Sequence, residues 1–139
     1  MAEVKNFLYC ERVGFNIIND KPESTLTNPF MVLSPKFIPG TISFSMFIAI
    51  SEDDRENSHN FRIIFKKVGE EENLIDTQNQ SLPQLPNEGL PEESSGYMLN
   101  MDFRDVVIRN QGKYESQVYF DGKLIGTYPI YAKAVENNG

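Results

Sequence analysis

The chain has 139 residues, of which 40% are hydrophobic, and this fits one folded domain with its own core and excludes a disordered polymer. Its net charge is −7, with no basic stripe and no polybasic segment, so we expect no nucleic-acid partner and no attachment to anionic lipid. No apolar run approaches the roughly 18 residues of a membrane-spanning helix, so we expect no membrane partner. The acidity favours solubility, and a basic partner or mimicry of DNA is the alternative interpretation.

The cellular setting is predicted from the first residues and from the cysteine content. The segment MAEVKNFLYCERVGF has no apolar stretch behind a basic one, which predicts no secretory signal. The single cysteine, Cys10, excludes an intrachain disulfide and a cysteine-based zinc cluster within one chain. We therefore expect a cytoplasmic protein.

The first half of the chain alternates with period two, which indicates strands. VKNFLYCERVGF (4–15) is the first strand candidate, and residues 25–40 follow as an irregular or edge segment because three prolines interrupt them. The strongest strand is TISFSMFIAIS (41–51). Its predicted inward face consists of Ile42, Phe44, Met46, Ile48 and Ile50.

The second half continues the pattern beyond a polar loop at 51–60. FRIIFKKV (61–68) is a strand, and LIDTQNQ (74–80) pairs back as a weak edge strand. Residues 81–96 contain three Leu-Pro steps without periodicity, so they are predicted to form a long surface loop. YMLNMDF (97–103) resumes as a strand, and RDVVIRNQ (104–111) is expected to cross over to the closing hairpin.

Consecutive strands without helices indicate an all-β, antiparallel sandwich or small barrel. We expect one domain over residues 1–134 and a flexible tail at 135–139.

The closing hairpin, GKYESQVYFDGKLIGTYPIYAKA (112–134), turns at Asp121-Gly122, a strong turn signal. A two-residue turn would pair Phe120 with Lys123 and Val118 with Ile125. A three-residue loop with a left-handed Gly122 would pair Val118 with Leu124. We favour the second register because it places the predicted inward residues of both arms on one face. These are Tyr114, Val118 and Phe120 on the first arm, and Leu124, Tyr128, Ile130, Ala132 and Ala134 on the second. Ser116 would then lie opposite Gly126 and leave a hollow for a large side chain from the facing sheet.

The stretch NQGKYES resembles the tyrosine corner of immunoglobulin-like sandwiches, in which a tyrosine hydroxyl bonds to backbone a few residues upstream. Tyr114 would be that tyrosine. Ser116 stands where antibody domains have a cysteine, so the chain is not a disulfide-bonded antibody-type domain.

Three stretches also resemble a family of small uncharacterised bacterial and phage-associated proteins: FLYCERVGF, PKFIPGTISFSMFIAI and GKYESQVYFDGKLIGTYPI. The resemblance implies an immunoglobulin-like sandwich of about seven strands and an intracellular setting. None of these stretches is a catalytic motif, and the resemblance implies no chemistry, because that family has no settled activity.

No catalytic residue, cofactor site or metal site is predicted. The only histidine, His59, lies in the polar loop, where we expect it to be solvated, and Cys10 lies in a predicted strand. The carboxylates of residues 52–56 are either calcium ligands or a solvated charge run, and their spacing does not match a calcium-binding loop.

The expected function is therefore non-catalytic recognition of another protein. The predicted contact residues are the outward tyrosines of the closing hairpin and the leucines of the Leu-Pro loop, namely Tyr119, Tyr131, Leu82, Leu85 and Leu90. The alternative is a structural or assembly component of a phage particle. The sequence leaves the partner and the oligomeric state open.

Overall fold

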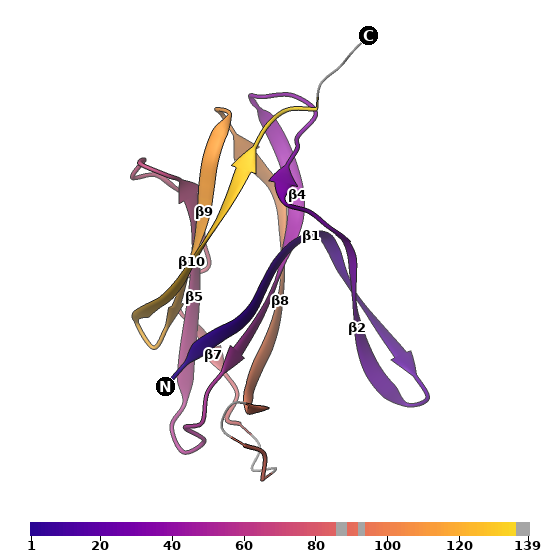
Figure 1. Cartoon of the computed structure of the whole chain (residues 1–139), viewed down its shortest axis with the longest axis vertical. Coiled ribbons are helices and arrows are strands. Elements are labelled where there is room, and N and C mark those ends of the chain that lie inside the picture. Colours follow the sequence, from indigo (N-terminus) through magenta and orange to yellow (C-terminus); the bar gives the residue numbers. More distant parts are fainter. Residues whose placement is uncertain (86–88, 92–93, 136–139) are drawn as a thin grey trace.

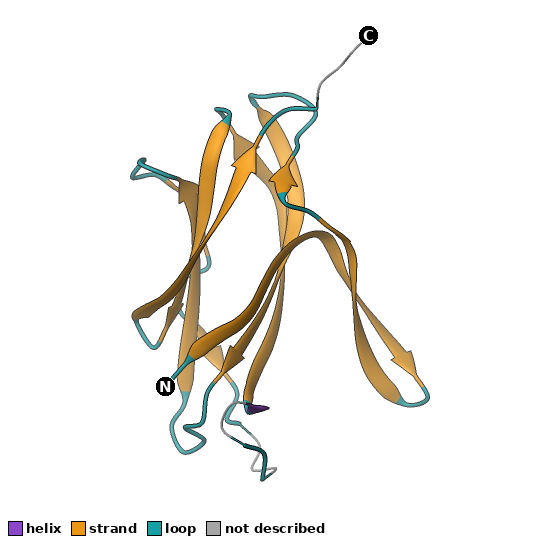
Figure 2. Ribbon diagram, in the orientation of Figure 1, coloured by secondary structure: helices purple, strands orange, loops and turns teal. Residues whose placement is uncertain are grey.

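The structure is a computed structural model that describes residues 1–85, 89–91 and 94–135. Among these residues the chain forms ten strands: β1 (Glu3–Ile18), β2 (Lys21–Pro29), β3 (Val32–Leu33), β4 (Gly40–Ser51), β5 (His59–Lys67), β6 (Asn73–Asp76), β7 (Gln80–Leu82), β8 (Gly96–Ile108), β9 (Gly112–Phe120) and β10 (Lys123–Ala132). The all-β prediction is confirmed for the described part of the chain (Figure 2). That part also contains no helix with the length and apolar character needed to cross a membrane.

The strands form two sheets (Figure 1). The first has the order β2-β1-β4-β8, with every pair antiparallel. The second has the order β3-β10-β9-β5-β6, with β7 also paired to β5. In this second sheet the pair β3–β10 is parallel, and the other pairs are antiparallel.

Both sheets contribute alternate residues to one shared core. Strand β4 gives Phe44, Met46, Ile48 and Ile50, all buried as its period-two pattern predicts. Strands β5 and β9 of the second sheet contribute Ile63, Phe65 and Val118 to the same core. The inward face predicted from alternation is therefore confirmed for β4 from Phe44 to Ile50, and Ile42 is partly buried against the same core.

Strand β8 is longer than predicted. The segment 104–111, expected to cross over, instead continues the strand to Ile108, which is fully buried. A bulge makes this possible, because the register against β4 shifts between Ile42 and Phe44. At the bulge Asp105 has a left-handed φ of 54°, and its amide donates to the Ser43 hydroxyl at 3.0 Å.

The Leu-Pro segment is more buried than predicted. Leu82 ends the short strand β7, and both Leu82 and Leu85 are 7% exposed and belong to the core. The Tyr97 hydroxyl donates to the Pro83 carbonyl at 2.8 Å and fixes this segment against β8. The expectation of a surface loop is wrong for both leucines, because they cover one end of the core. The loop's residues 86–88 and 92–93 lie outside the described part.

The closing hairpin begins with the two-residue turn that was considered as the alternative from the sequence, and it departs from that register beyond Leu124. Phe120 pairs with Lys123 across a two-residue turn in which Asp121 and Gly122 have left-handed φ values of 50° and 79°. The register then shifts between Leu124 and Gly126, so Val118 lies opposite Gly126. The favoured three-residue loop is wrong, and Leu124 is exposed.

Gly126 and Tyr128 explain the shift. A Cβ atom on Gly126 would lie 2.5 Å from the Tyr128 hydroxyl oxygen, so the glycine provides space for that ring. The Tyr128 ring in turn stacks on Phe7 of the other sheet, with ring centroids 4.3 Å apart. The bulge therefore leaves room for the contact between Tyr128 of the second sheet and Phe7 of the first.

Ser116 is opposite Tyr128, not Gly126, but it does receive a large side chain from the facing sheet. The Tyr9 hydroxyl of β1 lies 2.7 Å from the Ser116 hydroxyl and donates to the Tyr128 carbonyl at 2.6 Å. Burial raises the pKa of Tyr9 well above its ordinary value. This buried polar contact joins the first sheet to the second.

The predicted tyrosine corner bond is confirmed. The Tyr114 hydroxyl donates to the Asn110 carbonyl at 2.6 Å, and the ring is fully buried against Phe65. At the end of the chain, the amide of Val135 donates to the Pro35 carbonyl, so the first residue of the predicted tail is attached to the domain. The rest of that tail, 136–139, lies outside the described residues.

Candidate protein-binding surface

Strands β1 and β2 extend beyond the two-sheet body as a two-stranded ribbon. The pairing of β1 with β4 ends at Cys10–Ser45, whereas its pairing with β2 continues to Ile18–Lys21. Residues 12–18 therefore have β2 as their strand neighbour on one side and no described strand on the other. Figure 1 shows this ribbon projecting away from the body, with the turn at its far end.

The turn at the tip follows from two residues that accept left-handed conformations. Asn19 and Asp20 have φ values of 52° and 62° and link Ile18 to Lys21 as a two-residue hairpin. Asparagine and aspartate tolerate this region better than other side chains with a Cβ atom. The sequence therefore specifies a tight hairpin, with the ribbon's strands as its arms.

One face of the ribbon is apolar. Residues directly opposite in an antiparallel pair point to the same side, and so do alternate residues along each strand. This rule places on one face Val13 with Leu26, Phe15 with Ser24, and Ile17 with Pro22. We call these six residues the apolar ribbon face.

The apolar ribbon face is open to solvent. The side chain of Phe15 is 66% exposed and that of Ile17 is 71% exposed, while Val13 and Leu26 are half-buried. Single exposed apolar residues are ordinary, but a row of them along one strand face marks an interaction surface. A two-stranded ribbon is also marginally stable by itself, so an apolar face without a covering layer represents a free-energy cost that a partner would relieve.

The opposite face of the ribbon is mainly polar. It carries Arg12, Asn16 and Glu23. The side-chain amide of Asn16 donates a hydrogen bond to the Thr25 hydroxyl at 3.4 Å. Ile18 is the exception, next to the turn. The two faces of the ribbon therefore differ in character, one apolar and the other mainly polar.

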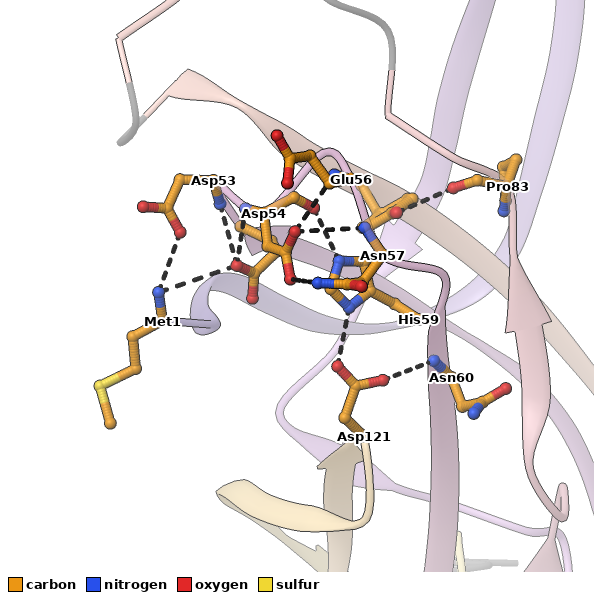
Figure 3. A network of polar contacts seen from close by, with 11 residues as sticks. Met1, Asp53, Asp54, Glu56, Asn57, His59, Asn60, Pro83 and Asp121 are labelled. Atoms are coloured by element: carbon orange, nitrogen blue, oxygen red, sulfur yellow. Dashed lines mark hydrogen bonds and ion pairs between the residues drawn. The ribbon is translucent and has the colours of Figure 1, made fainter.

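A polar network lies at the end of the body that contains His59 (Figure 3). The His59 ring is 3% exposed at the start of β5. Its Nδ1 lies 2.7 Å from a carboxylate oxygen of Asp121, and its Nε2 lies 2.7 Å from the Asp54 carbonyl oxygen. The expectation of a solvated loop histidine is wrong, because the ring is buried between the 51–60 loop and the β9–β10 turn.

The partners of His59 determine its protonation state. A carbonyl and a carboxylate only accept hydrogen bonds, so the ring satisfies both when each nitrogen carries a proton. Burial lowers the pKa of His59, but the hydrogen bonds to Asp54 and Asp121, together with the charges of Asp121 and Glu52, outweigh it and raise the pKa above 6.5. With both nitrogens occupied, the geometry makes His59 a link between segments.

Two carboxylates of the 51–60 loop, those of Glu52 and Asp54, accept hydrogen bonds from the loop's own backbone, and the carboxylate of Asp53 accepts one from the N-terminal amine of Met1 at 3.0 Å. A Glu52 carboxylate oxygen accepts from the amides of Asp53 and Asp54 at 3.1 and 3.0 Å. The Asp54 carboxylate accepts from the amides of Glu56 and Asn57, and these bonds and the Asn57 side chain hold its pKa below the ordinary value. Within the described residues, no group of three or more histidine, cysteine or acidic side chains is arranged to hold a metal ion.

The residues predicted to bind a partner are not brought together. Tyr131 and Leu90 are exposed, and Tyr119 is half-buried with its hydroxyl donating to the Gln117 side chain. Leu82 and Leu85 are buried. The ribbon was missed because the first strand was ended at Phe15; the continued alternation to Ile17 and the following Asn19-Asp20 pair are the signals that reveal it.

The fold and this surface together define an all-β protein of two sheets that carries an exposed, one-sided β ribbon. The sequence profile of a family of unknown function, DUF6941, matches residues 7–133. The chain therefore belongs to this family, and the match includes the whole ribbon. No curated protein matches the chain.

Proposed function

We propose that this protein is a non-catalytic protein-recognition module, acting inside the cell, that binds its partner through the apolar ribbon face. The observation that carries the proposal is a projecting ribbon with Phe15 and Ile17 exposed on one face and polar side chains on the other. Large apolar anchors of this kind supply most of the binding free energy in protein interfaces.

An immunoglobulin-like topology is part of the proposal. In such sandwiches strands B and E are neighbours in one sheet, and strands C, F and G are neighbours in the other. Here β4 and β8 are neighbours in the first sheet, and β5, β9 and β10 are neighbours in the second. The tyrosine corner at the start of β9 stands where this topology places it, at the start of strand F.

The test is capture of a protein from an extract of the source cell by the immobilised chain. Phe15→Thr with Ile17→Thr should remove the captured protein, because threonine keeps the strand propensity and removes the apolar anchors. Asn16→Thr, on the opposite face, should leave capture unchanged. Thermal melting of all variants controls for folding.

The same experiment tests the residues predicted from sequence. If Tyr119→Ala and Tyr131→Ala abolish capture while the ribbon variants bind normally, the recognition surface lies on the second sheet and the ribbon is not the site. If a partner is captured equally well by every variant, neither surface is the binding site.

The second candidate function is a structural or assembly component, such as a part of a phage particle. It is favoured by one observation: none of the six residues of the apolar ribbon face is ionisable. Such a face can meet an identical face without charge repulsion, as repeated assembly requires.

A further inference from the structure

The distribution of charge on the ribbon indicates the kind of partner. The chain has a net charge of −7, yet Arg12, Lys21 and Glu23 lie on the ribbon face opposite Phe15. Glu11, at the base of the ribbon, lies on the side of Phe15, and its carboxylate accepts from the Asn28 side chain at 3.4 Å. A highly charged partner would gain no electrostatic attraction from the apolar ribbon face. Two copies of an acidic chain can meet there without placing carboxylates against one another.

The pairing along the ribbon also suits a contact between identical surfaces. Phe15 stands opposite the small Ser24 on the same rung, so a large exposed ring lies beside a small side chain on each copy. In a two-fold interface the same patch contributes from both sides, so a patch needs both a protrusion and a recess to fit itself. The Phe15–Ser24 rung pairs a large side chain with a small one, which suits such a fit.

The size of the face sets the strength of such a contact. Phe15 is 66% exposed and Ile17 is 71% exposed, so only that part of each residue can still be covered. With about 150–250 Å² for a fully buried aromatic side chain, Phe15 contributes roughly 100–165 Å² on each copy. Specific, stable interfaces remove about 1,200–2,000 Å² in total, so a contact between two ribbon faces lies below that range, among weak and transient contacts. A dimer of this size depends on protein concentration.

We propose that the apolar ribbon face is a two-fold dimer interface, and that its occupant is the same face of a second copy of this chain. This inference rests on the proposed function, because it names the partner of the same surface. The polar turn at the ribbon tip, Asn19-Asp20, is consistent with contact along the face of the ribbon and not at its end.

The first test is the mass of the full chain in solution across the micromolar range, by sedimentation equilibrium or light scattering. The wild-type protein should change from monomer to dimer as concentration rises. Phe15→Thr with Ile17→Thr should raise the dimer dissociation constant at least about tenfold. Asn16→Thr, the matched variant on the opposite face, should leave it unchanged, and circular dichroism should show intact strands in each.

The second test does not depend on destabilising the face. Ser24→Cys leaves both apolar anchors in place and should give a covalent dimer on mild oxidation, because the two copies fit one another at the Phe15–Ser24 rung, whereas Asn16→Cys, on the opposite face, should stay monomeric. Cys10 is fully buried and remains in both variants.

The outcomes separate this inference from the proposed function. A wild-type chain that is monomeric at every concentration, or a dimer that the ribbon variants do not weaken, overturns the dimer. If the monomer then captures another protein through Phe15 and Ile17, the recognition function stands and only its partner changes. If the ribbon variants alter neither self-association nor capture, both proposals fail.

Discussion

At the scale of single residues, Tyr114 shows how one hydroxyl secures the connection between the two sheets. It starts the inward face of β9, and its bond to the Asn110 carbonyl at 2.6 Å closes the turn that follows β8. Removing the hydroxyl leaves the ring in place but removes the donor for a backbone carbonyl. The corner is thus a local feature with an effect on the whole domain.

We expect Tyr114→Phe to lower the free energy of unfolding by about 0.5–1.5 kcal/mol, with a larger loss if the Asn110 carbonyl finds no other donor. Urea denaturation measures this change. Tyr131→Phe is the control, because that hydroxyl lies on an exposed side chain. An unchanged midpoint for Tyr114→Phe would contradict a stabilising role for the bond.

His59 gives the domain a pH-dependent contribution to stability. Its pKa is raised in the folded protein, so folding favours the protonated ring. The contribution is fully present below the unfolded pKa of about 6.5 and is lost as pH rises through the higher folded pKa. Asp121, the Asp54 carbonyl and Glu52 are the groups that hold the proton there.

We therefore expect the stability difference between the wild-type protein and His59→Gln to be largest at mildly acidic pH and to shrink as pH rises. Glutamine keeps a polar side chain but does not titrate. Melting temperatures of both proteins from pH 5.5 to pH 9, at about half-unit steps, measure the difference. A difference that stays constant over this range would mean that the ring is not held protonated.

At the scale of elements, the Leu-Pro segment forms part of the core. Leu82 belongs to β7, which extends the second sheet through its pairing with β5, and Leu85 packs in the same cluster. This segment lies between two strands of different sheets and closes the end of the core near His59 and Tyr97. The two buried leucines, Leu82 and Leu85, therefore stabilise the folded domain.

We expect Leu82→Ala to destabilise the protein by about 2–5 kcal/mol, the usual cost of a large buried side chain truncated to alanine. Leu90→Ala, at an exposed position of the same segment, should change stability by less than about 0.5 kcal/mol. Chemical denaturation of the pair measures both. Equal, small effects would place Leu82 at the surface, as the sequence pattern had suggested.

Alternation in the sequence predicts which face of a strand is buried, but it does not predict the register of the last hairpin. The alternation of β4 identifies its buried face because its side chains meet the core one after another, from Phe44 to Ile50. The register of the last hairpin could not be obtained in the same way. It depends on the Tyr128 ring resting over Gly126 and stacking on Phe7, a contact between residues about 120 positions apart.

The candidate site was predictable in part. The Asn19-Asp20 turn and the alternation of Val13, Phe15 and Ile17 are local features, so the hairpin itself can be found in the sequence. That its apolar face lacks a covering strand or loop depends on where β4 ends, at the Cys10–Ser45 pair. The burial of His59 likewise depends on Asp121, which is 62 residues away.

At the scale of the whole molecule, the body and the ribbon differ in how their backbone hydrogen bonds are protected. In the body, strands such as β4 and β9 have a neighbour on each side and a facing sheet. In the ribbon, residues 12–18 and 21–27 pair only with each other among the described strands. Local opening therefore costs less free energy in the ribbon than in the body.

We expect amide hydrogen exchange at low protein concentration to be faster across residues 12–27 than across β4 and β9. Raising the concentration should slow exchange in the ribbon and leave the body unchanged, because a second copy that covers the apolar ribbon face makes opening of the hairpin more costly. Peptide-resolved exchange measured by mass spectrometry at two concentrations provides the comparison, with Phe15→Thr/Ile17→Thr as the control that cannot gain protection. Slow exchange in the ribbon of the dilute protein, equal to that of β4, would show that the hairpin is stable without a partner and would remove the energetic reason for covering it.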